Sequence, residues 1–315
     1  MQKLVSFVMA SGLITVMVFF GCRVNDQTSA VEEEESFALA KKAKVIAEVD
    51  PSSGKAVVNI PENAAQVAPN VFSLGTTLEK GKAVEGYAFV HYKQGYGRTA
   101  CDNDGVCEVG EHPKKCGDCS SGGVEDPPAS TCYGYIANDV KWKTVEPYLV
   151  DALNSEGLTA EYVSTTLARD IGEWENAAGA DILGDEIQGE VDRTGIGSLN
   201  GQNEVVFGDI GEPGAIAVTM VWGIFTGKPS GRQLVEWDMV FDEVDFDWSE
   251  DATGSTTEMD FENIAIHELG HSKGMGDLYD IGCADETMYG YATEGEIKKR
   301  SLEAGDIEGI QKLYK

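Results

Sequence analysis

Residues 263–280 read NIAIHELGHSKGMGDLYD, and this stretch decides how the rest of the chain is interpreted. It contains His267 and His271, which are four residues apart. Residues at this spacing project from the same face of an α-helix, so both imidazoles can reach one metal ion. Glu268 is displaced around the helix and is placed to reach a water at the metal, where a general base is needed.

The flanking residues predict where this helix begins and ends. Asp260 can cap a helix, so we expect a helix from 261 to about 273. Gly274 tolerates the left-handed backbone conformation that a chain reversal uses. Asp277 then arrives as a third ligand, because a carboxylate oxygen is a good zinc donor. Asp280 is a nearby alternative that ranks second. The sequence therefore predicts a Zn²⁺ site formed by the two histidines and Asp277.

The motif as a whole resembles a known signature. His267, Glu268, His271, Gly274 and Asp277 are similar to the long metzincin pattern H-E-x-x-H-x-x-G-x-x-H, with aspartate in the last position. The same aspartate is found in the snapalysin group of metzincins, so the resemblance is compatible with activity.

The sequence around the motif is similar to that of the matrixin branch of the metzincins. DFENIAIHELGH leads into the helix, TMYGYA supplies Met288 for the methionine turn beneath the metal, and LEAGDIEGIQKLY closes the chain. The resemblance covers about residues 132–315. It implies an α+β metzincin-type catalytic domain with a twisted mixed sheet, an active-site helix and a small C-terminal subdomain that carries the Met-turn. Residues 132–315 hold no histidines besides those of the motif, so the second, structural zinc of many matrixins is not expected.

The same resemblance implies a zinc endopeptidase, with Glu268 as general base and proteins or peptides as substrates. Residues 214–222, GAIAVTMVW, resemble the edge strand that lines the matrixin cleft and pairs with extended substrate. Residues 289–292 would help to wall the pocket after the scissile bond. The alternative function is that of a surface-anchored, non-catalytic binding protein whose metal site is structural or idle.

The net charge of the chain limits the classes of partner that it can bind. Its 315 residues include 54 Asp and Glu but only 24 Lys and Arg, for a net charge of −30. Nucleic acids and anionic membranes are bound through clusters of Lys and Arg. We therefore expect no nucleic-acid partner, contact with a membrane only through an N-terminal anchor or lipid, and a monomer with a solvated acidic coat.

The first 22 residues contain one lysine followed by an uncharged apolar run that ends at Cys22. This pattern is typical of a secretory signal. Because the run approaches bilayer-spanning length, an uncleaved membrane anchor is an alternative. The Gly-Cys pair that closes the run also resembles a lipobox, in which Cys22 is lipidated after cleavage. All three interpretations place the rest of the chain outside the cytoplasm, either free or at the cell surface.

Six cysteines remain after Cys22, and four of them crowd into residues 101–119. In an exported chain such a cluster is typical of a disulfide staple. We expect two bridges within 101–119 and a third between Cys132 and Cys283. Composition divides the chain before residue 132 into a polar tether (23–36), a small β-rich domain (37–95), a disulfide-rich module (96–120) and a linker (121–131).

The cysteine cluster also contains a candidate Ca²⁺ loop. Asp102, Asp104, Gly105 and Glu111 fall at offsets three, five, six and twelve of an EF-hand loop. Ala100 occupies the position of the first ligand, which counts against calcium. The loop equally resembles a disulfide knot with acidic side chains.

Hydrophobic alternation predicts strands in the β-rich region. KVIAEVD and KAVVNI flank PSSG as the two strands of a hairpin. Residues 82–93, KAVEGYAFVHYK, alternate as a strand that places Tyr87, Phe89 and His91 on one face. We interpret His91 as a structural or surface residue rather than a ligand.

Other elements are expected after residue 132. In LVEWDMVFD (234–242) apolar side chains share one face, and Glu236, Asp238 and Asp242 form a polar face opposite. Helical spacing of apolar residues predicts helices at about 159–178 and 303–314.

Overall fold

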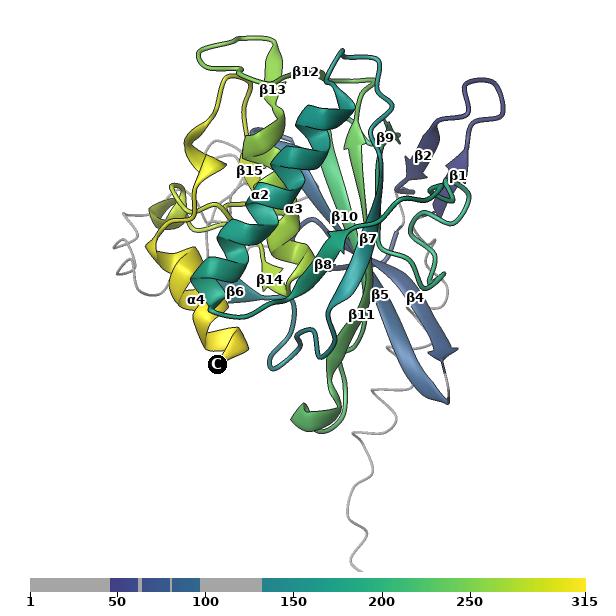
Figure 1. Cartoon of the computed structure of the whole chain (residues 1–315), viewed down its shortest axis with the longest axis vertical. Coiled ribbons are helices and arrows are strands. Elements are labelled where there is room, and N and C mark those ends of the chain that lie inside the picture. Colours follow the sequence, from purple (N-terminus) through teal and green to yellow (C-terminus); the bar gives the residue numbers. More distant parts are fainter. Residues whose placement is uncertain (1–45, 62–63, 80, 97–131) are drawn as a thin grey trace, which may run out of the picture. The chain divides into compact units, whose positions relative to one another are not determined.

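The fold is organised around one large mixed sheet (Figure 1). The structure is a computed structural model that describes residues 46–61, 64–79, 81–96 and 132–315. Cys22 with the N-terminal apolar run, the candidate calcium loop and the two bridges expected within 101–119 lie outside the described residues.

Eleven strands form this sheet, and their order does not follow the chain. β9 runs parallel to β11, β2 and β7, whereas β10 is antiparallel to both of its neighbours. β7 and β8 continue the sheet beside β9, and β15 pairs with β5. In spatial order the main path is β1 (Ile46–Val49), β2 (Ala56–Asn59), β9 (Glu204–Ile210), β11 (Gln233–Asp242), β10 (Ala215–Ile224), β5 (Lys82–Lys93), β4 (Val71–Glu79) and β3 (Gln66–Ala68), and the branches are β7 (Glu146–Asp151), β8 (Leu183–Glu186) and β15 (Tyr291–Ala292).

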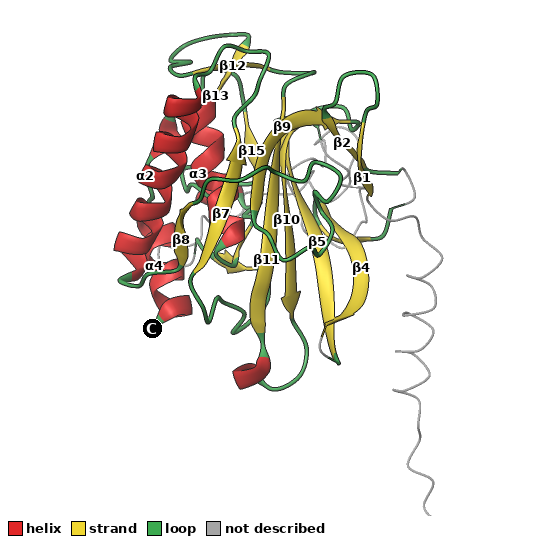
Figure 2. Ribbon diagram, turned by 45° about the vertical axis from the view of Figure 1, so that its right-hand side comes forward, coloured by secondary structure: helices red, strands yellow, loops and turns green. Residues whose placement is uncertain are grey.

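Helices cover one face of the sheet (Figure 2), which confirms the predicted α+β class. The structure describes the α-helices α2 (Ala160–Ala178), α3 (Phe261–Ser272) and α4 (Ala304–Tyr314). α2 packs against both α3 and α4. Thr159 caps the start of α2, and Gly179 ends it in the left-handed conformation. The predicted helices at 159–178 and 303–314 are therefore confirmed.

Short elements complete the described chain. They are β6 (Gly134–Tyr135), which pairs with β14 (Met275–Gly276), β12 (Asp247–Ser249), which pairs with β13 (Glu258–Asp260), and the 3-10 helices η3 (Pro229–Gly231), η4 (Ile281–Cys283) and η5 (Lys298–Arg300).

Strands from the two ends of the chain share the sheet. β1 and β2 form the predicted hairpin, and β5 coincides with the strand predicted at 82–93. β2 pairs with β9 and β5 pairs with β10, so the strands expected within 37–95 do not form a sheet of their own. Lys42–Lys315 is one compact unit.

The expectation of a free edge strand at residues 214–222 is wrong for this structure. β10 is hydrogen-bonded to β11 on one side and to β5 on the other. An exposed edge leaves backbone N–H and C=O groups without partners, and the long strand β5 satisfies them. The groove beside β10 is thus already filled by the chain itself.

The polar face of β11 is buried rather than solvated. Glu236 and Asp238 are only 1% and 0% exposed. Glu236 accepts hydrogen bonds from the backbone N–H groups of Asn200 (2.9 Å) and Gly201, and Asp238 accepts one from Gly197 (2.7 Å). Burial raises the pKa of Glu236 to about 7. These carboxylates hold the loop between β8 and β9 against β11.

Cys132 and Cys283 form the predicted disulfide. The bridge joins Cys132, two residues before β6, to the end of η4, across a sequence separation of 151 residues. It therefore ties the first described residue of the C-terminal part to the loop that follows α3 and β14.

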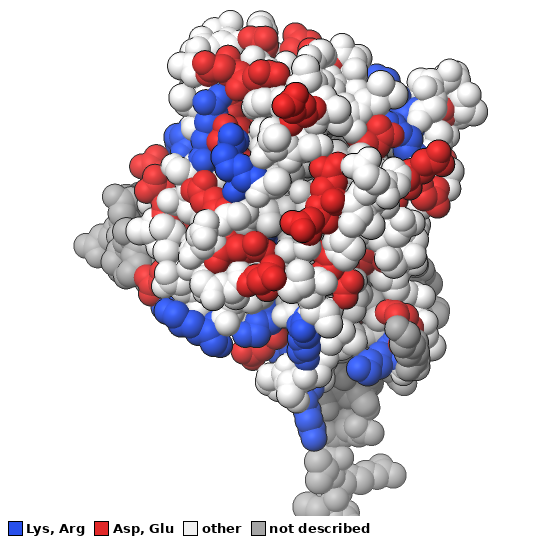
Figure 3. Space-filling model, in the orientation of Figure 1, with Lys and Arg blue, Asp and Glu red and all other residues white. Residues whose placement is uncertain are grey.

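Acidic side chains spread across the face shown in Figure 3, with basic ones interspersed, as expected for a net charge of −30. Basic side chains do not dominate this face. Within the described residues, no helix combines the length and apolar character that crossing a bilayer requires.

Candidate metal centre

Helix α3 carries the two histidines and is held at its start and at its middle. Asp260 caps it as predicted, accepting a hydrogen bond from the N–H of Asn263 at 2.9 Å. Trp174 of α2 donates from its indole Nε1–H to the carbonyl of Ile266 at 2.9 Å. The helix is buried along nearly its whole length, so its side chains have fixed surroundings.

The outer nitrogen of each imidazole has a backbone partner. His267 Nδ1 lies 2.7 Å from the carbonyl oxygen of Thr287, and His271 Nδ1 lies 3.0 Å from that of Met275. A carbonyl can only accept, so each Nδ1 carries the proton and each Nε2 presents a lone pair. This arrangement orients both rings as metal ligands.

Asp277 closes the third side of the site. Gly274 adopts a positive φ of 101°, which is the chain reversal predicted for it. Asp277 Oδ1 then lies 3.2 Å from His267 Nε2 and 3.3 Å from His271 Nε2. Burial alone would raise the pKa of Asp277, but the two histidines outweigh it and hold that pKa below its ordinary value.

The residues present fit a zinc ion. Among the described residues, His267 Nε2 and Asp277 Oδ1 are buried without a hydrogen-bond partner. Two imidazole nitrogens and one carboxylate oxygen thus point toward the same position. These three atoms are the donor set of a three-ligand zinc site. Asp277 Oδ2 is not free for a metal in the same way, because it accepts a hydrogen bond from the hydroxyl of Tyr279 at 3.0 Å.

The second-ranked ligand candidate lies elsewhere. Asp280 is exposed, and its Oδ1 accepts a hydrogen bond from the N–H of Gly282 at 2.8 Å. It thereby caps η4. The structure brings Asp277, and not Asp280, to the two histidines.

Glu268 lies beside the ligands and is fully buried. Its Oε2 accepts a hydrogen bond of 2.5 Å from the hydroxyl of Thr219 in β10. Its Oε1 lies 3.2 Å from Nδ1 of His91. Burial raises the pKa of Glu268 to about 7. A carboxyl group held in this way by two neighbours has a defined orientation toward the ligand cluster.

Of the two interpretations of His91, as a structural or as a surface residue, the structure excludes the second. This residue of β5 is 1% exposed, and its ring centroid lies 3.9 Å from that of His267. Its Nε2 lies 3.5 Å from Nζ of Lys299, which is also buried. The reason is the pairing of β5 with β10, which carries the Tyr87, Phe89 and His91 face of the strand onto α3.

Sequence reasoning missed His91, Thr219 and Tyr279 as neighbours of the site. One signal was present for His91, since it is one of only four histidines and shares a strand face with two aromatic residues. This signal did not show which strand pairs with residues 82–93, because a local sequence pattern does not specify pairing between distant segments. Nothing local distinguishes Thr219 or Tyr279.

The Met-turn connects the site to the C-terminal helix. Asp306 of α4 accepts hydrogen bonds from the N–H groups of Thr287 (2.7 Å) and Met288 (3.1 Å). Thr287 in turn accepts from His267 through its carbonyl. Met288 is fully buried and contacts α3 at Gly270, where the absence of a side chain leaves room for its sulfur.

Gly270→Ala is expected to destabilise the protein by about 2 kcal/mol or more, because the added Cβ would overlap the Met288 sulfur and lie 2.9 Å from the Trp174 ring. Gly172→Ala in α2 is the matched control. Its Cβ would meet no atom within 4 Å, so it should stabilise by roughly 0.5–1 kcal/mol. Urea unfolding of both variants measures the difference; a neutral Gly270→Ala would show that Met288 does not pack tightly on α3.

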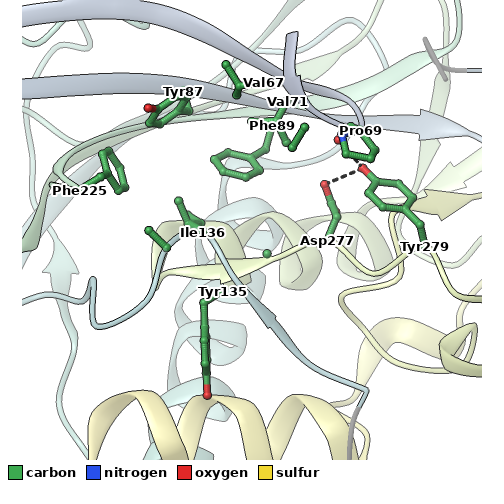
Figure 4. A pocket seen from close by; sticks show the side chains of 13 residues that line it. Val67, Pro69, Val71, Tyr87, Phe89, Tyr135, Ile136, Phe225, Asp277 and Tyr279 are labelled. Carbon is green, nitrogen blue, oxygen red and sulfur yellow. Dashed lines mark hydrogen bonds between the residues drawn. The ribbon is translucent and has the colours of Figure 1, made fainter. Parts of the chain in front are cut away.

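An apolar cavity of 390 Å³ reaches the candidate ligand Asp277 (Figure 4). Phe89 and Tyr87 of β5 line one side, and Ile136 and Phe225 line others. The cavity gives a small apolar group access to the neighbourhood of the ligands, but His267, Glu268 and His271 themselves are at most 1% exposed.

The C-terminal segment matches a known family. Residues 228–315 match the matrixin family model, Peptidase_M10. Mouse stromelysin-1 is 37% identical over 81 residues (25% of this chain and 15% of the relative), human matrilysin is 42% identical over 77 residues (24% and 26%), and metalloendoproteinase 2-MMP of Arabidopsis thaliana is 28% identical over 185 residues (58% and 45%). The chain thus spans less than half the length of each of these relatives. The segment that carries α3, Asp277 and the Met-turn is matrixin-like, as its signature predicts.

Proposed function

We propose that the protein is a zinc-dependent endopeptidase that acts outside the cytoplasm. The observation that carries the proposal is the convergence of His267 Nε2, His271 Nε2 and Asp277 Oδ1 beside the buried Glu268. The match of this segment to matrixins supports the same reaction class. The location rests on the N-terminal apolar run, which lies outside the described residues.

His267, His271 and Asp277 would hold the zinc. The ion, when bound, supplies Lewis acidity that polarises a peptide carbonyl and acidifies a water. Glu268 is the side chain placed to take the proton of that water and return it to the leaving amine. Thr219 fixes one oxygen of Glu268, and the other, which His91 contacts in this structure, would take the proton once His91 has moved away. Tyr279 holds the second oxygen of Asp277 and so keeps Oδ1 directed at the metal position.

The substrates we propose are proteins or peptides bound in extended form. β10 and β15 both pair with β5 in this structure, and displacement of β5 would expose the backbone hydrogen-bonding groups that an added strand uses. β15 lies within residues 289–292, the segment that is expected to wall the pocket after the scissile bond. The side-chain preference of that pocket is not part of the proposal.

Metal removal provides the first test. The purified chain is expected to contain about one zinc per molecule. Treatment with 1,10-phenanthroline should abolish cleavage of casein, and added Zn²⁺, but not Mg²⁺, should restore it. Atomic absorption measures the metal and electrophoresis measures the cleavage. A zinc-free chain that cleaves as well as the loaded one would refute the proposal.

A second candidate function is a non-catalytic binding protein with an idle metal site. The position of His91 favours it, because this imidazole lies against His267 and Glu268 on the side where an active site needs an opening. The two candidates differ in one measurement. An idle site binds zinc but never cleaves peptides, even under conditions that displace β5.

A further inference from the structure

β5 lies where an extended peptide would pair with β10. It runs antiparallel to β10, with Phe89 opposite Thr219 and His91 opposite Ala217. The end of β5 also pairs in parallel with β15. The strand therefore passes between the two segments that flank the metal centre. Any peptide that adds to β10 needs the same backbone groups, so β5 and a bound peptide exclude each other.

The side chains of β5 cover the metal centre. The Phe89 ring stacks on His271 with centroids 4.7 Å apart and an angle of 25° between the planes. His91 lies over His267 and contacts Glu268. These contacts leave the proposed base and both histidine ligands at most 1% exposed. A peptide carbonyl cannot reach them while β5 is in place.

Further contacts hold β5 from its outer side. The N–H of Val90 donates to the carbonyl of Asn70 at 3.1 Å, and Lys93 forms an ion pair of 2.5 Å with Glu294. The hydroxyl of Tyr279 lies 3.0 Å from both the carbonyl oxygen of Pro69 and Oδ2 of Asp277, and the two acceptors share its single proton. The turn before β4 is thereby linked to the loop that carries a proposed ligand. The contacts that close the groove therefore also position the loop that carries Asp277.

We propose that β5 is an intramolecular occupant of the peptide-binding groove and that each molecule is latent while its β5 is paired with β10. The proposal rests on the proposed peptidase function for the identity of the groove. It assigns His91 as the side chain that blocks the base and the metal position. Catalysis then requires reversible displacement of residues 82–93 from β10, so that the activity of the full chain comes from the molecules in which the strand has moved.

A reversible crosslink tests whether β5 has to move. Ala88 and Met220 are directly opposed between β5 and β10, and both belong to the core on the face away from α3. Opposed residues of antiparallel strands have Cβ atoms about 4.5–5.5 Å apart, near the spacing that a disulfide accepts. In the full chain, Ala88→Cys with Met220→Cys can therefore fasten β5 to β10 without altering a residue of the metal centre.

Two readouts separate gating from catalysis. The first is binding of a fluorescein-labelled tripeptide hydroxamate to the zinc-loaded chain, followed by anisotropy. The second is cleavage of casein. Wild type and the two single cysteine variants pass through the same oxidation and reduction, which controls for the native disulfide and for core repacking. Mass spectrometry verifies the crosslink, and circular dichroism verifies the fold.

The oxidised pair is expected to bind the hydroxamate at least ~100-fold more weakly than the reduced pair and to show no casein cleavage. Reduction should restore both. Equal binding in the two redox states would overturn the proposal, as would a failure of both states to bind. Binding that depends on reduction without any cleavage would sustain the latency and refute the peptidase function instead.

His91→Ala provides an independent test if the cysteine pair does not crosslink. Removal of the imidazole opens the space beside Glu268 and His267, so hydroxamate binding to the full chain should tighten by about tenfold. Unchanged or weaker binding, with zinc content and fold retained, would contradict the role of His91 as the blocking side chain.

Discussion

Glu268→Gln is expected to reduce kcat for peptide cleavage by about 10³-fold, because proton transfer by a positioned base contributes a factor of this order. The amide has nearly the shape of the carboxyl group but cannot accept the proton. Thr219 and His91 can still hydrogen-bond to it, so the fold should persist. Zinc content should also persist, since Glu268 is not among the proposed ligands. Steady-state kinetics with a quenched peptide, together with metal analysis, measure both.

Glu262→Gln is the matched control for this substitution. Glu262 lies in the first turn of the same helix and pairs with Arg169 at 2.7 Å, remote from the ligand cluster. Exposed or partly exposed ion pairs contribute little, so kcat should stay within about twofold of wild type. If Glu268→Gln cleaves at the rate of this control, Glu268 is not the base.

Asp277→Ala is expected to weaken zinc binding by at least ~100-fold, because it removes one of three donors and the only anionic one. It also leaves Tyr279 without the carboxylate that accepts its hydroxyl hydrogen bond. Competition with a fluorescent zinc chelator measures the affinity directly, independent of activity. Peptidase activity should fall in parallel at low zinc concentration.

Asp280→Ala controls for the loss of a nearby acidic residue. Asp280 caps η4 from an exposed position and should leave zinc affinity within about twofold of wild type. If the two variants lose zinc equally, the loop is held by its overall charge rather than by one ligand. If only Asp280→Ala loses zinc, the assignment of the third ligand is reversed.

The parts of this protein that sequence predicts well are those decided by neighbours along the chain. The cap at Asp260, the common face of the two histidines and the reversal at Gly274 each depend on a few adjacent residues, and the structure contains all three. The strand at 82–93 and the hairpin before it are equally local patterns, and they form where alternation predicts them.

The errors concern which segments meet. Alternation shows that Tyr87, Phe89 and His91 share a face, but not that this face lies on α3. It shows a polar face on β11, but not that a loop buries it. It predicts a strand at β10, but not that β5 takes its edge. The sequence of a strand specifies its partner only through side-chain shape and polarity. Pairings between distant segments therefore cannot be predicted from a single sequence.

The hydrogen bonds that Asp306 accepts from the Met-turn also bear on biosynthesis. Asp306 follows every proposed ligand in the sequence, yet it holds the turn whose carbonyl orients His267. A ribosome makes the chain from its N-terminal side. During translation β5 and β10 are therefore available before the residue that supports His267 has been made. A truncation just before residue 306 would leave every proposed ligand encoded and still deprive His267 of its support.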